Sequence, residues 1–515
     1  MRSRTAWWLA VIAAAVLMGR CATEGGEAPT LLDPAQAPKW SADDLEFYLH
    51  GSIGDEWVPE RVLRAFAGAN PDLFPGGDLR AYGVIGEMLG SPPVGFSRRE
   101  VKHLGCLPSW GINCAACHTG QLEDASGKPL GLVLSLPGTF DVGGYFGAII
   151  VSMLRATKPE GMQKLLGAFV GGEYATAALR MEADAIAKTV ADDPFATKGI
   201  AAGTLHDITP EELSSPKDLA AFAHSLLKLF HNMRVALHVP DDLPEDTGTA
   251  PGPGRADAFV GLANGLLGIP RQSESASKFG VPWSLDDHAW YDWDGNSQDA
   301  LSAHVAAALS SGCPMTGDGA LVPMDNIKRF RALTETIQPP KWPFGVHAEA
   351  AKRGEKTYAA QCAKCHDVEG EERLFAPEVV GTDPNRARMF DQAMVDGLDK
   401  WLGSLKVQGF EFKKGGLRAT NKYVANRLDG VWARAPYLHN GSVRTMRELL
   451  TEPAKRAKTW KRGSRVYAPY EMGFTDKGGF VFDTAVSGNS NAGHDYGTGL
   501  TDEEKRDLIE YLTGR

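Results

Sequence analysis

Two short stretches of the sequence place two cysteines and a histidine at the spacing C-x-x-C-H. They consist of Cys114, Cys117 and His118 in the first stretch and of Cys362, Cys365 and His366 in the second. Two thiols one helical turn apart can add to the two vinyl groups of a haem, and the adjoining imidazole then binds the iron. A lone C-x-x-C pair would also suit a redox disulfide or half of a zinc site. Because both copies carry the histidine, the sequence predicts two covalently bound haem c groups, with His118 and His366 as iron ligands.

The second iron has several candidates for a ligand on its other face. The methionines and histidines that we consider are Met389, Met394, His439, Met472 and His494. His494 stands in a loop rich in glycine and asparagine, and His439 precedes an Asn-Gly pair that predicts a tight turn. A haem that only transfers electrons keeps two protein ligands, whereas one that activates oxygen or peroxide needs an open position. The residues alone leave the choice of this ligand open.

A pair of helices is predicted around the second motif. Gly354 lies on the face of a helix that leads into the motif, and residues 500–512 form another helix, in which Thr501 and Glu504 make a capping box. We expect the two helices to pack together, with Gly354 allowing close contact near Tyr511. This arrangement resembles the paired terminal helices of a cytochrome c domain.

The elements that must position these groups are predicted to be mainly α-helical, with little β structure. Residues 22–100 form an N-terminal extension, and residues 344–515 form a C-terminal cytochrome c-like domain. Between them, residues 101–338 form an N-terminal haem domain with a helical insertion and a Trp-rich segment between the haems. Residues 143–205 and 216–239 have the apolar spacing of helices that would build the insertion.

The N-terminal residues predict the compartment. Within residues 1–21, Arg2 and Arg4 precede a short apolar run that ends before Arg20 and Cys21, which is typical of a signal peptide for export. An alternative is a lipoprotein signal with Cys21 as the lipidated residue, although Arg20 stands where such signals have a small side chain. We expect a periplasmic or secreted bacterial protein, or an outer-membrane lipoprotein. No later stretch has the roughly 18 uninterrupted apolar residues of a membrane span.

Composition excludes a nucleic-acid binder and leaves three cysteines to explain. The formal net charge is −10 and 23% of the residues are charged, so no basic excess exists to neutralise phosphates.

Four of the seven cysteines belong to the two motifs, which leaves Cys21, Cys106 and Cys313. Cys106 and Cys313 can pair in an oxidising compartment or remain two thiols, and the sequence does not decide between these states.

Three stretches of the sequence carry a resemblance to a known family. They are GINCAACHTGQL around the first motif, RAPYLHNGSV after the second, and GNSNAGHDYGTGLTDEEKRDLIEYL at the end. Together with the two C-x-x-C-H motifs, they resemble the bacterial dihaem cytochrome c peroxidase superfamily. Within it, the chain is most similar to the haem-dependent rubber oxygenases, secreted dihaem dioxygenases that cleave cis-polyisoprene, and to their homologues. The chain is shorter than we expect for a rubber oxygenase.

The resemblance implies how the two haems are bound. His118 would bind the first haem, whose other face would be open to oxygen. His366 and His494 would bind the second haem on its two sides. His439 matches a histidine that lies behind the ligands or between the haems.

The resemblance also implies a tryptophan that carries electrons between the haems. Trp283 suits that place best, with Trp290 and Trp293 as alternatives. The catalytic residues would then be His118, Trp283 and His439.

The function implied is that of an oxidoreductase that activates oxygen or hydrogen peroxide at the first haem, with the second haem as an electron relay. A small redox protein would donate electrons, and a hydrophobic organic molecule would be a substrate. The alternative is a dihaem electron carrier, or the cytochrome subunit of a dehydrogenase, in which His103, His231 or a methionine caps the first iron. A further interpretation takes the basic residues 455–465 as a docking site for an acidic redox partner or a membrane surface, against a merely solvated loop.

Overall fold

The computed structural model describes the chain from residue 30 to residue 515, with gaps. The described residues are 30–86, 92–101, 107–170, 226–227, 230, 248–281, 283, 290–298, 300–313, 315–316, 319–320, 322–407 and 409–515. Cys21, His103, Cys106 and His231 lie outside these ranges, as does the expected signal peptide. The predictions made for these residues, including the pairing of Cys106 with Cys313, therefore remain predictions.

Paired strands lie on both sides of the first motif. The strands are β1 (Val58–Pro59), β2 (Phe96–Val101), β3 (Leu107–Ile112), β4 (Thr119–Glu123) and β5 (Pro129–Leu134). The first three form an antiparallel sheet in the order β1-β3-β2, and β4 and β5 form a hairpin. Helix α4 (Cys114–His118) connects β3 to β4. The motif is thus a single helical turn fixed at both ends by strands, with β1 from the predicted N-terminal extension.

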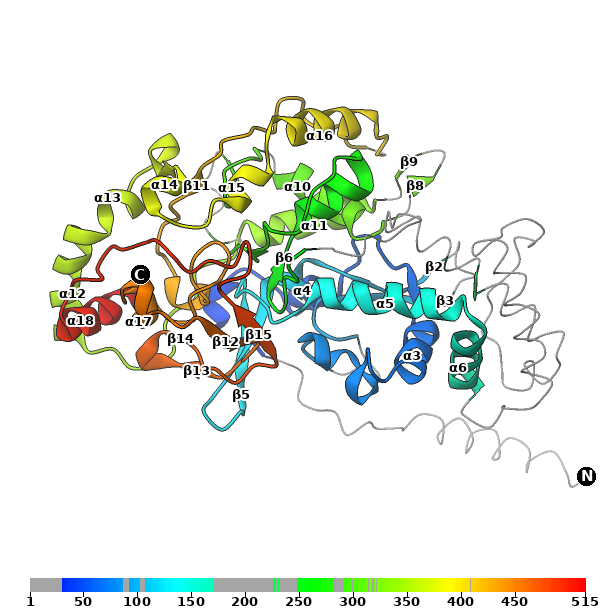
Figure 1. Cartoon of the computed structure of the whole chain (residues 1–515), viewed down its shortest axis with the longest axis horizontal. Coiled ribbons are helices and arrows are strands. Elements are labelled where there is room, and N and C mark those ends of the chain that lie inside the picture. Colours follow the sequence, from blue (N-terminus) through cyan, green and yellow to red (C-terminus); the bar gives the residue numbers. More distant parts are fainter. Residues whose placement is uncertain are drawn as a thin grey trace, which may run out of the picture.

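Helices pack against this sheet in the first half of the chain, and the three labelled α3, α5 and α6 lie on the right in Figure 1. They are α2 (Ala42–His50), α3 (Glu60–Ala69), α5 (Val142–Ala156) and α6 (Pro159–Val170). Helices α3, α5 and α6 share an apolar cluster with the sheet, in which Phe66, Trp110 and Tyr145 are buried. Helices α5 and α6 begin the expected helical insertion, and nearly all of residues 171–239 lies outside the described ranges.

Residues 248–338 connect the two halves. The elements are β6 (Arg255–Ala256), α9 (Ala258–Gly261), a π-helix η6 (Leu262–Leu267), β7 (Ser277–Lys278), α10 (Ala300–Ser310), β8 (Met315–Thr316), β9 (Gly319–Ala320) and α11 (Met324–Thr334). Strands β6 and β7 pair antiparallel, and the residues that follow β7 reach the first motif, as described below.

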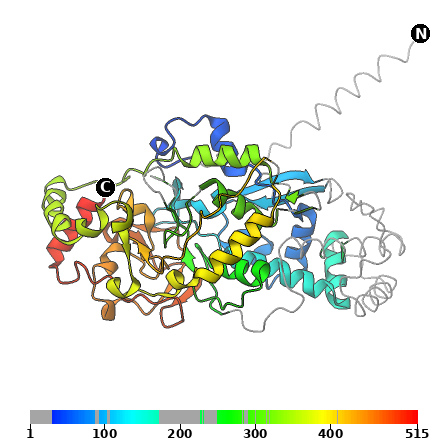
Figure 2. The same ribbon diagram turned by 90° about the horizontal axis from the view of Figure 1, so that it is seen from above.

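The helices of the second half include the predicted pair. They are α12 (Ala348–Gln361), α13 (Ala363–His366), α14 (Pro377–Val380), α15 (Asn385–Met389), α16 (Gln392–Ser404), α17 (Met446–Leu449) and α18 (Asp502–Leu512). Helices α12 and α18 lie side by side in Figures 1 and 2. The predicted capping box of Thr501 and Glu504 is present. Gly354 does allow the close contact, but it lies against the backbone of Asp507, while the ring of Tyr358 meets that of Tyr511 at 5.1 Å.

The prediction of a mainly α-helical fold with little β structure is wrong, because the chain is a mixed α and β protein. Besides the strands above, the second half has β10 (Leu374–Phe375), β11 (Tyr423–Val424), β12 (Thr459–Arg462), β13 (Tyr467–Ala468), β14 (Gly473–Phe474) and β15 (Phe480–Asp483). These form the antiparallel pairs β10-β11, β12-β15 and β13-β14. Strands of two to four residues are too short to show the alternation of apolar and polar residues that marks a strand in a sequence.

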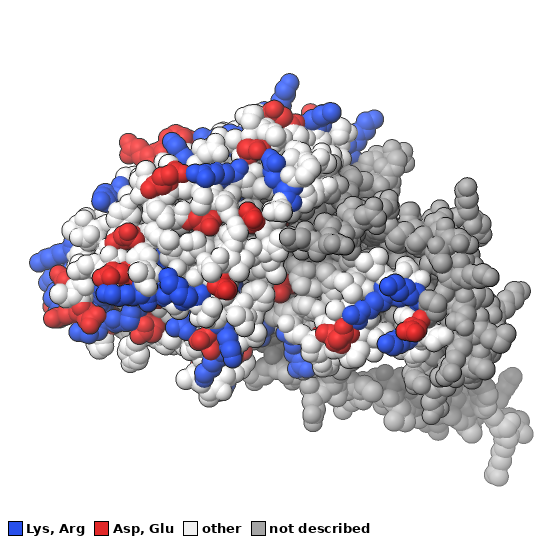
Figure 3. Space-filling view, viewed as in Figure 1, with Lys and Arg blue, Asp and Glu red and all other residues white. Residues whose placement is uncertain are grey.

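Short 3-10 helices occupy several of the remaining connections. They are Pro34–Gln36, Pro75–Gly77, Leu79–Tyr82, Gly370–Arg373, Val431–Arg434, Pro453–Lys455 and Pro469–Glu471. Across the described ranges, no helix combines the length and the apolar character needed to cross a membrane. On the face in Figure 3, acidic and basic side chains are interspersed over the part of the surface that is described.

Candidate haem sites

The first motif begins at an N-cap that also ties it to the neighbouring helix. The side chain of Asn113 accepts a hydrogen bond from the backbone of Ala115, and its amide nitrogen donates to the carbonyls of Leu49 and Gly51 at the end of α2. Capping residues of this kind satisfy backbone groups at a helix start. The short helix α4 therefore holds Cys114 and the rest of the motif in a fixed place.

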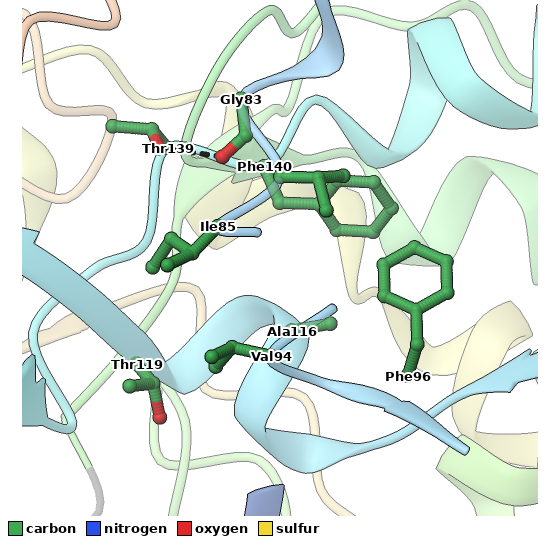
Figure 4. Close-up of a pocket in the computed structure, with 9 residues that line it drawn as sticks. Gly83, Ile85, Val94, Phe96, Ala116, Thr119, Thr139 and Phe140 are labelled. Atoms are coloured by element: carbon green, nitrogen blue, oxygen red, sulfur yellow. Dashed lines mark hydrogen bonds between the residues drawn. The ribbon is translucent and has the colours of Figure 1, made fainter. Parts of the chain in front are cut away.

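A cavity of about 10 Å³ lies behind α4, and Figure 4 shows the side chains that line it. Phe96, Phe140 and Ile85 surround it, with Ala116 and Thr119 from the motif side. Such a volume holds at most about one water molecule. Among the residues that the structure describes, the side chains behind α4 are therefore closely packed.

His118 is oriented by a backbone carbonyl that is distant in sequence. Its Nδ1 lies 2.8 Å from the carbonyl oxygen of Gly280, and since a carbonyl only accepts, Nδ1–H is the donor. Burial lowers the pKa of His118, which favours the neutral ring with a lone pair on Nε2. Metal-binding histidines commonly donate their other ring nitrogen in this way. The ring of Phe279 lies 6.1 Å away.

His366 repeats this arrangement in the second motif. Its Nδ1 lies 2.7 Å from the carbonyl oxygen of Asn426, and burial again lowers its pKa. The motif follows α12 and forms α13. Both histidines of the two motifs are therefore held, in different surroundings, as neutral rings with Nε2 available.

His494 faces His366 at a distance that suits a shared metal. The two ring centroids are 6.4 Å apart, and the ring planes are inclined by 48°. Two imidazoles that each place a nitrogen about 2 Å from one metal hold their ring centres roughly 6 Å apart. Nδ1 of His494 is buried without a hydrogen-bond partner. Burial, together with nearby His366 and Arg456, lowers the pKa of His494 to about 4, so its ring is neutral as well. These residues fit an iron between them.

The loop that carries His494 is fixed by Arg456. Gly493 and His494 both have positive φ angles, 76° and 52°, which is uncommon for a residue with a side chain. Arg456 is 2% exposed, and its guanidinium donates to five carbonyls: those of Leu449, Thr451, Asn491, Gly493 and His494. This buried cation stabilises a backbone conformation that would otherwise be unfavourable.

The position of Arg456 also bears on the basic residues 455–465. Arg456 and Arg462 are buried, and Arg462 donates to the carbonyl of Gly441. Arg465 donates to the carbonyl of Gly83. These arginines bind the protein's own backbone. For these three side chains, neither a docking site for a partner nor a solvated loop is the right interpretation.

Trp283 lies between the segments that hold the two motif histidines. It is 2% exposed and follows Gly280, the acceptor of His118, by three residues. Its indole nitrogen donates to the carbonyl of Asp429, 3.1 Å away, and a Cβ at Gly430 would lie 3.0 Å from its ring. Asp429 in turn follows Asn426, the acceptor of His366, by three residues.

The two alternative tryptophans have different surroundings. Trp293 donates to the carbonyl of Lys278, 3.0 Å away, and so also lies beside the segment that reaches His118. Trp290 lies under the guanidinium of Arg418, at 3.8 Å from the ring centroid.

His439 is hydrogen-bonded inside the protein. Its Nε2 lies 3.1 Å from the hydroxyl of Tyr423, and the two rings are stacked with centroids 4.2 Å apart. Burial, followed by the charges of Arg386 and Arg255, lowers the pKa of His439 to about 3. Its carbonyl accepts from the backbone of Lys278. His439 therefore joins the β7 segment to β11 as a neutral, buried ring.

The three methionines considered as ligands are packed in apolar surroundings. Met389 and Met394 belong to a cluster with Phe390. Met472 is fully buried in the main core, and its carbonyl accepts the hydroxyl of Tyr437. Apolar packing accounts for all three side chains.

His304 is a candidate that the sequence analysis missed. It lies on α10, its Nδ1 is 2.7 Å from the carbonyl of Ala300, and its charge is among the causes that lower the pKa of His118. It is the single imidazole in an otherwise apolar and small-residue helix, which is the signal that would have drawn attention to it.

Comparisons with known proteins indicate a c-type cytochrome. A family model described as RoxA-like, cytochrome c-like matches residues 422–461, which include Tyr423, Asn426, Arg434, His439 and Arg456. The uncharacterized protein y4iJ of Sinorhizobium fredii is 34% identical over 244 residues, which are 34% of this chain and 41% of that protein. The uncharacterized protein y4iM of the same organism is 31% identical over 226 residues, 40% of this chain and 50% of that protein. The chain thus spans half or less of these curated relatives, and what the comparisons support is a RoxA-like cytochrome c-like domain, and with it covalently bound haem and redox activity.

Proposed function

We propose that the chain is an exported dihaem c-type cytochrome oxidoreductase. The first haem, held by Cys114, Cys117 and His118, activates oxygen or hydrogen peroxide. The second, held by Cys362, Cys365, His366 and His494, relays electrons. The observation that carries the proposal is the place of Trp283, which contacts the segment that orients His366 and lies three residues from the carbonyl that orients His118. The open face of the first haem rests on the resemblance to the dihaem peroxidase superfamily.

Each group of the chain has a defined task in this proposal. When bound, a haem c with a vacant axial position reduces oxygen or peroxide, and one with two imidazole ligands transfers single electrons at low potential. The carbonyls of Gly280 and Asn426 accept hydrogen bonds from Nδ1–H of His118 and His366 and fix the direction of the two rings, while burial keeps the rings neutral. Trp283, buried between them, offers an aromatic ring through which electrons pass. The electron donor is a small redox protein, and the oxidised substrate is a hydrophobic organic molecule.

The place of action is proposed to be the periplasm or the exterior of the cell. Haem c is attached outside the cytoplasm in bacteria, and residues 1–21 have the composition of an export signal. Lipidation at Cys21 would tether the same protein to the outer membrane.

A carbon monoxide titration of the reduced protein tests the open iron. We expect one carbon monoxide bound per two haems, because the paired imidazoles His366 and His494 occupy both faces of the second iron. The pyridine haemochrome assay measures the haem content, by which the amount of bound carbon monoxide is divided. Absence of binding would mean that both irons have two protein ligands, and the oxygenase or peroxidase proposal would be abandoned.

His304 favours a second candidate function, that of an electron carrier or dehydrogenase subunit. If His304 binds the first iron, the wild-type protein binds no carbon monoxide and His304→Ala binds one per two haems. If the first iron is open, His304→Ala leaves the stoichiometry unchanged. His347→Ala, which removes a histidine just before α12 that donates through its backbone to Glu510, is the matched control and is expected to change nothing.

Arg456→Met is expected to release His494 from the second iron. The substitution leaves five buried carbonyls without their donor, and each lost hydrogen bond costs about 1 kcal/mol. The loop then relaxes from its positive φ angles, and carbon monoxide binding rises toward two per chain as the second iron opens. Arg447→Met, which breaks a half-buried pair with Glu471, serves as the control. An unchanged stoichiometry and an unchanged spectrum in Arg456→Met would show that His494 needs no such support or is not the ligand.

A further inference from the structure

A row of neighbouring cations lies largely in the interior of the protein. Its members are Arg255, Lys278 and Arg462, which are buried, and Arg434, which is partly buried with its Nε inside the protein. Neighbours in the row are close enough to lower one another's pKa: Arg255 acts on Arg462, and both Arg462 and Arg434 act on Lys278. Within the described ranges, none of the four has a carboxylate at ion-pair distance. Buried charges in proteins are normally paired.

Most of these cations are satisfied by backbone carbonyls or amides. Arg462 donates to the carbonyl of Gly441, and Arg255 donates to Asn489 and to the carbonyl of Ala276. Lys278 donates to the carbonyls of Arg434 and Pro436. Through the first of these bonds, Lys278 fixes the backbone of Arg434.

Arg434 differs from the others in its position beside Trp283, and like Arg255 it has a buried Nε without a partner. Its Nη2 donates to the carbonyl of Asp429 at 2.8 Å, whereas its Nε is buried and has no hydrogen-bond partner. The guanidinium lies 5.3 Å from the ring centroid of Trp283. A buried N–H without an acceptor is unfavourable, and a bound anion would supply the acceptor. A carboxylate matches the donor geometry of arginine best.

The neighbourhood of Arg434 indicates which carboxylate this is. The segment of Arg434 includes Asn426, whose carbonyl holds His366, and the charge of Arg434 contributes to lowering the pKa of His366. A second buried guanidinium, that of Arg373, acts on both Arg434 and His366. A haem attached at Cys362 and Cys365 would carry two propionate carboxylates, which are anions of the kind that these guanidinium groups would bind.

We propose that Arg434 binds a propionate of the haem attached at Cys362 and Cys365, with its Nε as a donor, and that it thereby joins this haem to Trp283. The inference rests on the second haem of the proposed function and is independent of whether the first iron is open. Arg434 is then a binding residue of the haem, and its contact with Trp283 extends the haem toward the segment that orients His118.

The test is the midpoint potential of the second haem in Arg434→Gln, measured by spectroelectrochemistry between pH 5 and pH 9. In the wild type the guanidinium keeps the propionate ionised, so the potential is flat over this range. In Arg434→Gln the lost cation shifts the potential to more negative values at pH 8. The propionate then takes up a proton as the pH falls, so the potential rises again toward pH 5.

Arg388→Gln is the control, because it removes the same charge from an exposed pair with Glu378 and is expected to leave the potential unchanged. A potential in Arg434→Gln that stays flat and equal to that of the wild type, with both haems present, overturns the proposal. If Arg434→Gln does not take up haem, Arg434→Lys tests the same contact by resonance Raman spectroscopy. Replacement of a forked donor by an ammonium shifts the propionate bending band, and an unshifted band overturns the proposal. Neither measurement depends on carbon monoxide or oxygen, so failure here is distinguishable from failure of the proposed function.

Discussion

Replacement of His118 by alanine is expected to abolish turnover of oxygen or peroxide while the second haem keeps its spectrum. In the proposed function His118 is the ligand that the first iron receives from its own motif, and the carbonyl of Gly280 accepts a hydrogen bond from its ring. Mutation of groups that only orient a metal ligand already reduces activity or affinity by about 10- to 100-fold, so loss of the ligand itself should exceed this. The measurements are steady-state oxygen or peroxide consumption and the reduced absorption spectrum of each haem.

The companion variant His366→Ala separates the two sites. It is expected to perturb the spectrum of the second haem and to slow electron delivery, while carbon monoxide still binds the first iron. Full turnover in His118→Ala would contradict the assignment and move the active iron to the second site.

Asp294→Ala is expected to destabilise the protein by about 3–5 kcal/mol, the usual result of removing one partner of a buried ion pair. Asp294 and Arg386 are 1% and 3% exposed at their side chains, and two hydrogen bonds of 2.9 and 3.3 Å join them. Without the carboxylate, the guanidinium of Arg386 remains buried among Phe259 and Tyr423 with its charge uncompensated. Urea denaturation followed by tryptophan fluorescence measures the loss.

The exposed pair of Arg388 and Glu378 supplies the control for this stability experiment. Both side chains are more than half exposed, and such pairs contribute about 0–1 kcal/mol, so Arg388→Ala should change the free energy of unfolding little. In the double variant Asp294→Ala with Arg386→Met, part of the stability should return because no charge is left buried. Equal losses in Asp294→Ala and Arg388→Ala would show that burial does not strengthen the first pair.

The sequence predicted those features that are written within a few neighbouring residues. The capping box of Thr501 and Glu504 lies in one helical turn, and the helix that begins there is present. The packing of that helix on α12 was also predictable, since Gly354 is the kind of residue that lets two backbones meet.

The features that the sequence could not predict depend on contacts between residues that are distant in the chain. The acceptors of His118 and His366 are backbone carbonyls of Gly280 and Asn426. Every residue has a backbone carbonyl, so the sequence does not indicate which one will be the acceptor. Arg456 acts on a loop more than 30 residues away, so a local view of its basic neighbours suggested a surface. The prediction missed the short strands for a related reason: a strand of two to four residues is determined by the segment that it pairs with more than by its own residues.

The pairing of α12 with α18 has a consequence for how the protein matures. The strands β2 to β5 around Cys114 lie within residues 96–134, whereas α12 finds its partner α18 only after residue 512 has been synthesised. Chains are synthesised N-terminus first, so α12 has no partner until the last residues of the chain have followed it. Under the proposed function, the haem at Cys362 and Cys365 is therefore enclosed last, when α18 at the end of the chain packs on the helix that precedes this motif.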